Sequence, residues 1–290
     1  MNIAQTVKSR TLRGNQDCVA GNGRKFAIRD SHSTLYSAMQ HKRAQVIIAP
    51  IAVMLFLGAW ASIVRLSQLP PYILPGPDRV WTRLLSLGWP TLLYHAGMTA
   101  SEVLSGLALG MAVAFSLGYV LARSVLLERL LAPYLVASQS VPTVAIAPIL
   151  VIWVGTGRLS KVLVAALIVF FPILINTITG LRGADPGLRE LMRSLRATRW
   201  QMLTKLEIPA ALPVLLSGLK VGATLSVIGA VVGEFVGADR GLGFLVNQGQ
   251  GLYDTALMFV AVLTLATMSI SLYSLVTLIE YWLLAWKRET

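Results

Sequence analysis

The sequence predicts an all-α integral membrane protein with about six transmembrane helices. Hydrophobic residues make up 55% of the 290 positions and charged residues only 13%, with a mean hydropathy of +0.68. A soluble domain is about 25% charged, so these residues cannot supply a soluble surface of ordinary composition. Long uncharged runs support the same class, because a helix needs about 20 apolar residues to cross the hydrocarbon core and several runs in this sequence reach that length.

The predicted organisation is a flexible basic tail, residues 1–43, followed by a transmembrane domain, residues 44–290. The tail is polar and has no apolar periodicity. The spans expected in the transmembrane domain cover residues 44–64, 96–122, 130–157, 162–181, 212–237 and 255–279.

The spans differ in how they are interrupted. The first is uncharged between two arginines, and a proline-rich loop after it leads into a short interfacial helix expected at 78–87. The third span is uncharged but is expected to break at its prolines, Pro133, Pro142 and Pro148. The fourth span is uncharged, and a charged loop at 182–209 separates it from the fifth.

The distribution of lysine and arginine predicts the orientation in the membrane. Six spans place both termini on one side. That side carries eighteen basic residues in its tails and loops, and the opposite loops carry six. Basic residues are enriched in cytoplasmic loops, so both termini and the loop 182–209 are expected in the cytoplasm.

Signatures of catalysis and metal binding are missing from the sequence. It contains no Walker A loop, no H-E-x-x-H motif and no nucleophile elbow. Its single cysteine, Cys18, excludes a disulfide framework and a cysteine-based metal site. We therefore expect no catalytic residue, metal ligand or cofactor site in this chain. The net charge of +12 is interpreted through membrane topology, and no nucleic-acid partner is expected.

Three ionisable residues fall inside predicted spans, where burial of a charge is expensive and suggests a function. Glu102 and Glu234 lie near the outer boundary, and Lys220 lies near the cytoplasmic boundary, to which its long side chain can extend. Each residue could instead be solvated at the interface or make a structural bond between helices. Glu234 is the best candidate of the three for a solute pathway.

Glycines at four-residue spacing allow two helices to approach closely. Such pairs occur at Gly106 and Gly110 and at Gly218 and Gly222, and a longer series occurs at Gly229, Gly233 and Gly237. The longer series predicts that the fifth span packs closely against another helix, with a subunit seam as one place for this contact.

The charged loop between the fourth and fifth spans carries a helical pattern. Leu188, Leu191, Met192 and Leu195 follow the i, i+3, i+4, i+7 spacing of one helix face. The segment is too short and too charged to cross a membrane. It either lies on the inner leaflet or docks into a groove of a cytoplasmic partner, and the pattern alone leaves both open.

These residues resemble the cytoplasmic loop of the membrane subunits of type I ABC importers, with the signature E-A-A-x-x-x-G, nine residues, then I-x-L-P. Glu190 takes the glutamate position, and Leu206-Glu207-Ile208-Pro209 lies at the distance of I-x-L-P. The resemblance implies a coupling helix docked into a cleft of the ATPase subunit. The docking residues implied by it are Glu190, Leu191, Met192, Leu195, Arg196, Ala197 and Pro209.

Arg196 stands where the family has the glycine. Glycine permits the positive φ of a tight turn after a short helix. We therefore expect Arg196 either to accept strain or to take a conventional φ, in which case the turn shifts or the helix continues.

The resemblance extends over about residues 60–286. The stretches "LPPYILPGPDRVW", "SQSVPTVAIAPILVIWVGTG" and "IGAVVGEFVGADRGLGFLV" resemble the permeases for nitrate, sulfonates and taurine and their relatives for hydroxymethylpyrimidine and riboflavin-like vitamin precursors. Glu102 stands where sulfonate permeases usually have a basic residue, and "VVGEFVGADRGLG" is closer to the vitamin-precursor branch. Both features favour that branch.

The resemblance also implies the partners and the mechanism. Two copies of the chain would form a pore in the bacterial inner membrane, two ATPase subunits would bind ATP and Mg²⁺ below it, and an extracytoplasmic binding protein would deliver a small solute. Transport would follow by alternating access. Polar residues near the middle of apolar helices are the candidates for the pathway, together with the glutamate of the fifth span: Gln139, Thr143, Asn176 and Glu234.

A single-chain secondary transporter or channel is the alternative. Such a protein is expected to show an inverted repeat with matching broken helices in its two halves. The proline break of the third span has no counterpart in the sixth. A membrane-embedded enzyme would need a catalytic constellation, and the sequence has none.

Overall fold

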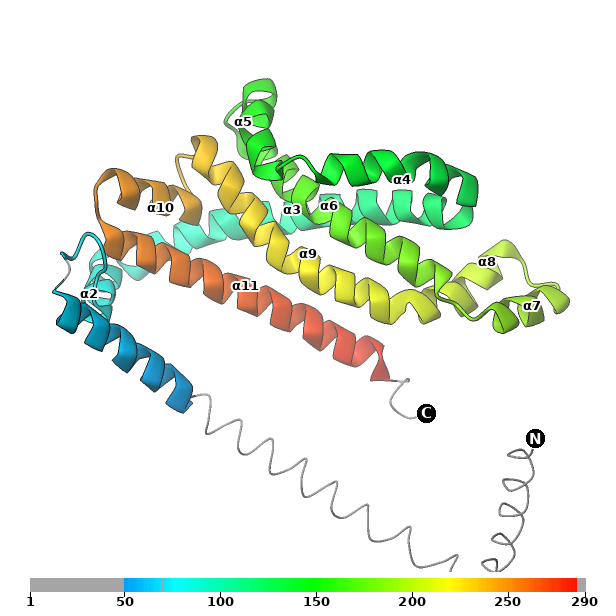
Figure 1. Cartoon of the computed structure of the whole chain (residues 1–290), viewed down its shortest axis with the longest axis horizontal. Helices are drawn as coiled ribbons and strands as arrows, with labels where there is room; N and C mark the ends of the chain where they lie inside the picture. The colour runs from blue at the N-terminus through cyan, green and yellow to red at the C-terminus, as the bar shows by residue number, and fades with distance from the viewer. Residues whose placement is uncertain (1–49, 69, 286–290) are drawn as a thin grey trace, which may run out of the picture. The chain divides into compact units, whose positions relative to one another are not determined.

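The computed structural model describes residues 50–68 and 70–285, which form helices joined by short connections (Figure 1). The expected tail at 1–43 and the beginning of the first span, 44–49, lie outside these residues. A helix, Pro50–Ser67, corresponds to the remainder of the first span. It crosses the boundary between two compact units that divide the chain after Ile63, and the following description concerns the second unit.

The helices of the second unit follow one another with few connecting residues. They are α2 (Pro77–Leu87), α3 (Trp89–Arg123), α4 (Val125–Gln139), α5 (Thr143–Val154), α6 (Arg158–Arg182), α7 (Pro186–Ser194), α8 (Arg199–Met202), α9 (Ile208–Gly237), α10 (Leu242–Gly251) and α11 (Thr255–Leu283). A single π-helical turn, Leu203–Glu207, joins α8 to α9. The described residues contain no β-strand, which agrees with the predicted all-α class.

The described part of the chain contains five helices that are long and apolar enough to cross a membrane. A sixth span results if α4 and α5, which meet at a bend of 90°, are counted together. The bend coincides with Pro142, which precedes α5. Pro133 and Pro148 lie inside α4 and α5 without ending them, so the expected break occurs only at Pro142. A proline removes one backbone hydrogen bond, and the rest of a membrane helix can continue around it.

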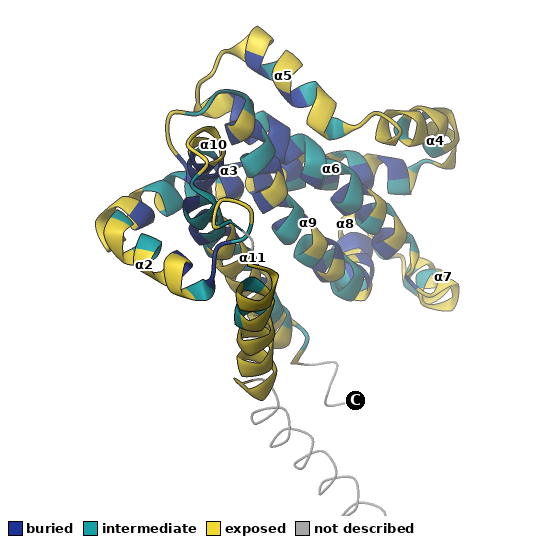
Figure 2. Cartoon of the chain, turned by 60° about the vertical axis from the view of Figure 1, so that its left-hand side comes forward, coloured by how far each residue is buried: buried dark blue, intermediate teal, exposed yellow. Residues whose placement is uncertain are grey.

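Helix α6 forms the centre of the second unit because it packs against both α3 and α9. Its inward side chains are almost completely buried, including Val164, Val169, Ile173 and Leu174. Figure 2 shows buried residues gathered along α6 and mostly exposed residues on α4. Since α6 carries the core, its two ends hold the loops on either side in place.

Glycines on α3 allow its close approach to α6. A Cβ atom on Gly106 would lie 2.5 Å from the Ala165 Cβ, and one on Gly110 would lie 2.7 Å from the carbonyl oxygen of Ala166. Real Cβ atoms do not approach so closely, so any side chain at these positions would push the helices apart. Small residues at this spacing are typical of tight helix packing in membranes.

The glycine series on α9 faces α6 and the connection before it. Cβ atoms would lie 2.6 Å from Ala165 Cα at Gly229, 2.9 Å from Lys161 Cα at Gly233 and 3.1 Å from Thr156 Cγ2 at Gly237. The close contact expected of these glycines is therefore directed at the same chain. This face of α9 is already occupied and cannot form the subunit seam considered above.

Ion pairs join the C-terminal helix to the rest of the second unit. Lys220 of α9 pairs with Glu280 of α11, and its ammonium lies 5.7 Å from the centre of the Tyr273 ring. Near the other end of α11, Asp254 caps the helix by accepting from the Leu257 amide and pairs with Arg83 of α2 at 2.6 Å. Lys220 is thus a structural residue with a partner on a neighbouring helix.

Candidate functional site

The loop that carries the importer-like motif folds into a short, well-bounded helix, α7. The Asp185 carboxylate caps its first turn by accepting from the amides of Gly187 at 2.6 Å and Leu188 at 3.3 Å. Pro186 occupies the first helical position, where a missing N–H group does no harm. The helix therefore forms from local signals within the loop.

The outer face of α7 is apolar and uncovered. Leu188, Leu191 and Leu195 are 49%, 54% and 69% exposed. Glu190 is exposed beside them, and Met192 is half-buried. No element in the described residues packs over this stripe. An exposed apolar stripe on a helix that is too short to cross a membrane favours contact with a partner protein or with the membrane surface.

The turn that ends α7 has Arg196 in the left-handed region, with φ of +55°. The Ala197 amide donates to the carbonyl of Met192 at 3.0 Å, and the Arg196 amide donates to that of Arg193 at 2.9 Å. These two bonds define a Schellman motif, whose left-handed position is usually glycine. Of the two expected outcomes, the chain accepts strain at Arg196 and keeps the turn in place.

The residues implied as docking elements lie in two places. Glu190 to Ala197 occupy α7 and its final turn, whereas Pro209 is the second residue of α9, after the π-helical turn. Pro209 and Ala197 are half-buried. A docking role remains a prediction for all of them.

Two arginines tie the charged loop to the end of α3. Arg182, the last residue of α6, donates to the carbonyls of Leu121 at 2.9 Å and Ala122 at 3.3 Å. Arg123 pairs with the buried Glu207 at 2.8 Å. Arg189 of α7 in turn donates to the Leu181 carbonyl of α6 at 2.7 Å, so a force on α7 can reach α6 and, through Arg182, α3.

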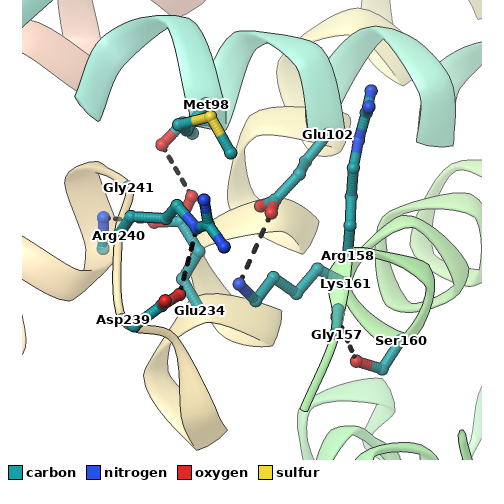
Figure 3. A network of polar contacts seen from close by, with 12 residues as sticks. Met98, Glu102, Gly157, Arg158, Ser160, Lys161, Glu234, Asp239, Arg240 and Gly241 are labelled. Carbon is teal, nitrogen blue, oxygen red and sulfur yellow. Dashed lines mark hydrogen bonds and ion pairs between the residues drawn. The ribbon is translucent and has the colours of Figure 1, made fainter. Parts of the chain in front are cut away.

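At the opposite end of α3, Glu234 holds the turn between α9 and α10 (Figure 3). Its carboxylate accepts from the Thr99 hydroxyl at 2.6 Å and from the Gly243 amide. Gly241 has φ of +116°, and a Cβ there would lie 2.3 Å from a Glu234 oxygen. The His95 Nδ1 accepts from the Gly241 amide at 3.0 Å. Only glycine fits this turn, because both the backbone angle and the space exclude a side chain.

A buried ion pair lies next to Glu234. The Lys161 ammonium is 3.5 Å from one oxygen of Glu102, and these two residues are only 4% and 1% exposed. The second oxygen of Glu102 has no hydrogen-bond partner among the described residues. Figure 3 shows both side chains approaching each other from α3 and α6.

A polar cavity of about 640 Å³ adjoins this pair. Its lining includes Glu102 and Lys161 together with Arg158, Asp239 and Arg240. Sequence reasoning placed Lys161 in an outer loop, whereas the structure buries it in the first turn of α6. The local signal was weak, since Lys161 lies only four residues after Gly157 of a predicted loop, and its partner lies 59 residues earlier.

The four candidates for the solute pathway do not form one cluster. Gln139 is exposed at the end of α4, and Thr143 is half-buried at the start of α5, across the bend from it. Asn176 donates to the Pro172 carbonyl at 2.8 Å within α6 and packs on α9. Glu234 is buried at the end of α9 that lies away from the loop 182–209. Their role in transport remains a prediction.

Comparisons with known proteins assign the chain to a family. Residues 106–285 match the family model described as "Binding-protein-dependent transport system inner membrane component". The chain is 46% identical over 242 residues to the riboflavin transport system permease protein RibX of Chloroflexus aurantiacus, covering 82% of this chain and 89% of the relative.

Two further relatives are more distant. The identity is 35% over 219 residues to the formylaminopyrimidine transport permease protein ThiX of Halalkalibacterium halodurans, covering 76% of this chain and 88% of that protein. It is 30% over 236 residues to the putative aliphatic sulfonates transport permease protein SsuC of Bacillus subtilis, covering 80% and 85%. The chain therefore belongs to the family of binding-protein-dependent transport system inner membrane components, and it is a multi-pass permease subunit of an ABC importer in the bacterial inner membrane, with the ATPase on a separate subunit.

Proposed function

We propose that this permease imports a heterocyclic vitamin precursor of the flavin or pyrimidine type. Identity supports this class: it is 46% to the riboflavin permease and 35% to the formylaminopyrimidine permease, against 30% and 27% to sulfonate and taurine permeases. Glu102 is a second support, because it stands where the sulfonate permeases that the chain resembles usually have a basic residue.

The coupling of transport to ATP is proposed to act through α7. The observation that carries this proposal is the exposed stripe of Leu188, Leu191 and Leu195. Burying three such side chains in a partner's groove contributes several kcal/mol, at roughly 1.5–3 kcal/mol for each fully buried side chain. ATP and Mg²⁺ bind to the ATPase partner in this proposal, and α7 faces the cytoplasm together with both termini.

The pore is proposed to form between two copies of this chain. Closure of the ATPase subunits moves α7, the bond from Arg189 to the Leu181 carbonyl carries this motion to α6, and the bonds of Arg182 carry it on to α3. The solute then passes from an outward-facing to an inward-facing pathway near the bend that carries Gln139 and Thr143. An extracytoplasmic binding protein delivers the solute.

Reconstitution of the permease with the ATPase and the binding protein that are encoded by neighbouring genes tests this function. We expect ATP-dependent uptake of riboflavin or a formylaminopyrimidine into proteoliposomes, and no uptake of taurine under the same conditions. Uptake of taurine in place of both heterocycles would refute the substrate class. Uptake that persists without the ATPase would refute the importer mechanism and favour a secondary transporter.

A further inference from the structure

A strongly basic cavity lies between α7 and the ends of the transmembrane helices. Its volume is about 530 Å³, and four arginines line it: Arg123 of α3, Arg189 and Arg193 of α7, and Arg199 of α8. One glutamate, Glu207, completes the charged lining. With one acidic group against four guanidinium groups, the cavity carries a formal charge of +3.

Most of this charge has no acidic partner in the structure. Glu207 neutralises only Arg123, at 2.8 Å. Arg189 donates through one terminal nitrogen to the Leu181 carbonyl at 2.7 Å, but its buried Nε has no hydrogen-bond partner within residues 70–285. In the same part of the chain, Arg193 and Arg199 make no ion pair and no side-chain hydrogen bond. The cavity therefore offers unused guanidinium donors to an anion.

The position of the cavity at the ends of α3 and α6 points to a phosphate group at the membrane boundary as its ligand. Tyr119, one turn before the end of α3, and Leu181, next to the end of α6, also line it. The ends of transmembrane helices lie at the level of lipid headgroups, where aromatic residues are enriched. Basic pockets at this level between transmembrane helices bind anionic headgroups. Guanidinium groups recognise phosphate oxygens with paired hydrogen bonds.

The ATPase is a less suitable occupant because α7 has two distinct faces. At about 100° per residue, Arg189 and Arg193 share a face that lies roughly 150° around the helix from the stripe of Leu188, Leu191 and Leu195. The stripe is exposed, whereas the arginine face is directed at the cavity and the ends of α3 and α6. A partner docked on the leucines leaves the cavity on the membrane side of the helix.

We propose that this cavity is a phosphate-binding site, filled by the headgroup of an anionic phospholipid or by free phosphate. The bound anion bridges Arg189 and Arg193 of α7, Arg199 of α8 and the end of α3. It thereby holds the coupling helix at a fixed distance from the transmembrane helices. The site is independent of the imported solute, so its occupancy can be measured without knowing the substrate.

The test uses the full-length permease in complex with its ATPase in detergent. Dioctanoyl phosphatidylglycerol, dioctanoyl phosphatidylcholine and inorganic phosphate are titrated separately, and the melting temperature reports binding. We expect saturable stabilisation by phosphatidylglycerol and none by phosphatidylcholine. Stabilisation by inorganic phosphate alone would assign the site to the free anion.

Two double variants with the same change in charge localise the site. Arg193→Gln/Arg199→Gln removes two exposed lining arginines, and we expect a loss of about tenfold or more in affinity. Arg129→Gln/Lys205→Gln removes two exposed charges at the same end of the transmembrane helices but outside the cavity lining, and the affinity should stay within about twofold.

Equal losses in the two double variants would overturn the proposal, because diffuse attraction to the loop would then explain binding. Absence of any saturable stabilisation would overturn it as well. If the lining variant instead loses the ATPase during purification while lipid binding is unchanged, the cavity belongs to the subunit interface and the proposal is wrong.

Discussion

Replacing Arg196 by glycine should stabilise the turn that ends α7, the helix proposed to couple transport to ATP. Arg196 has φ of +55° while its amide and that of Ala197 complete the Schellman motif. The left-handed conformation costs an L-residue roughly 1–2 kcal/mol. Glycine avoids this strain but loses about 0.5–1 kcal/mol more backbone entropy on folding. The expected net gain for R196G is about 0.5–1 kcal/mol, with the backbone bonds unchanged.

Hydrogen exchange of residues 188–200 in the permease–ATPase complex measures this gain. A stabilisation of about 0.5–1 kcal/mol slows local opening roughly two- to fivefold, so the amides of residues 196 and 197 should exchange more slowly by that factor. ATP-dependent uptake should be retained or more tightly coupled to ATP hydrolysis, since α7 still ends at the same residue in the variant.

The matched control is Arg196→Ala. It removes the same charged side chain but leaves an L-residue at positive φ, so exchange should be as fast as in the parent or faster. If R196G exchanges as fast as R196A, the backbone argument fails. A severe loss of uptake in both R196G and R196A would show that the arginine side chain itself acts in coupling.

Three further substitutions test other parts of the structure. Gly241→Ala should abolish uptake and lower the melting temperature, because its Cβ would lie 2.3 Å from a buried carboxylate oxygen. The control is Gly155→Ala, which is also at positive φ but has no atom within 4 Å, and it should have a much smaller effect on both measurements. Glu102→Gln and Lys161→Met should each lower the free energy of unfolding by about 3–5 kcal/mol, and the double variant should lower it by less than the sum of the two single effects. Additive effects in thermal unfolding would argue against the pairing of these two residues. Leu191→Glu should abolish co-purification of the ATPase. The melting temperature of the permease alone should be unchanged, because the Leu191 side chain is 54% exposed. Retained co-purification would exclude docking through the leucine stripe.

The all-α membrane class of the fold could be predicted from the sequence because it depends on local composition. Uncharged runs of about 20 residues become helices in any membrane context. The effect of single prolines was less predictable. Pro142 coincides with a 90° bend, whereas Pro133 and Pro148 sit inside helices. Which proline bends a chain depends on what packs around it, and the sequence of one segment does not contain that information.

The polar pairings could not be predicted because their members are far apart in the chain. Glu102 and Lys161 belong to different helices, as do Lys220 and Glu280. Helical spacing identifies neighbours three or four residues apart but says nothing about a partner about 60 residues away. The exposed leucine stripe of α7 could be predicted for the opposite reason, because all its leucines lie within two turns of one helix.

The π-helical turn at Leu203–Glu207 sets the rotation of α8 relative to α9. The Ile208 amide bonds to the Leu203 carbonyl, five residues earlier, so the turn holds one residue more than an α-helical turn. Removing that residue would rotate everything before it by about 100° about the helix axis. Arg199, at the start of the 39-residue helix Arg199–Gly237, would then leave the lining of the basic cavity. The extra residue in the π-helical turn therefore determines which side chains of α8 face the charged loop when α9 is packed in the transmembrane core.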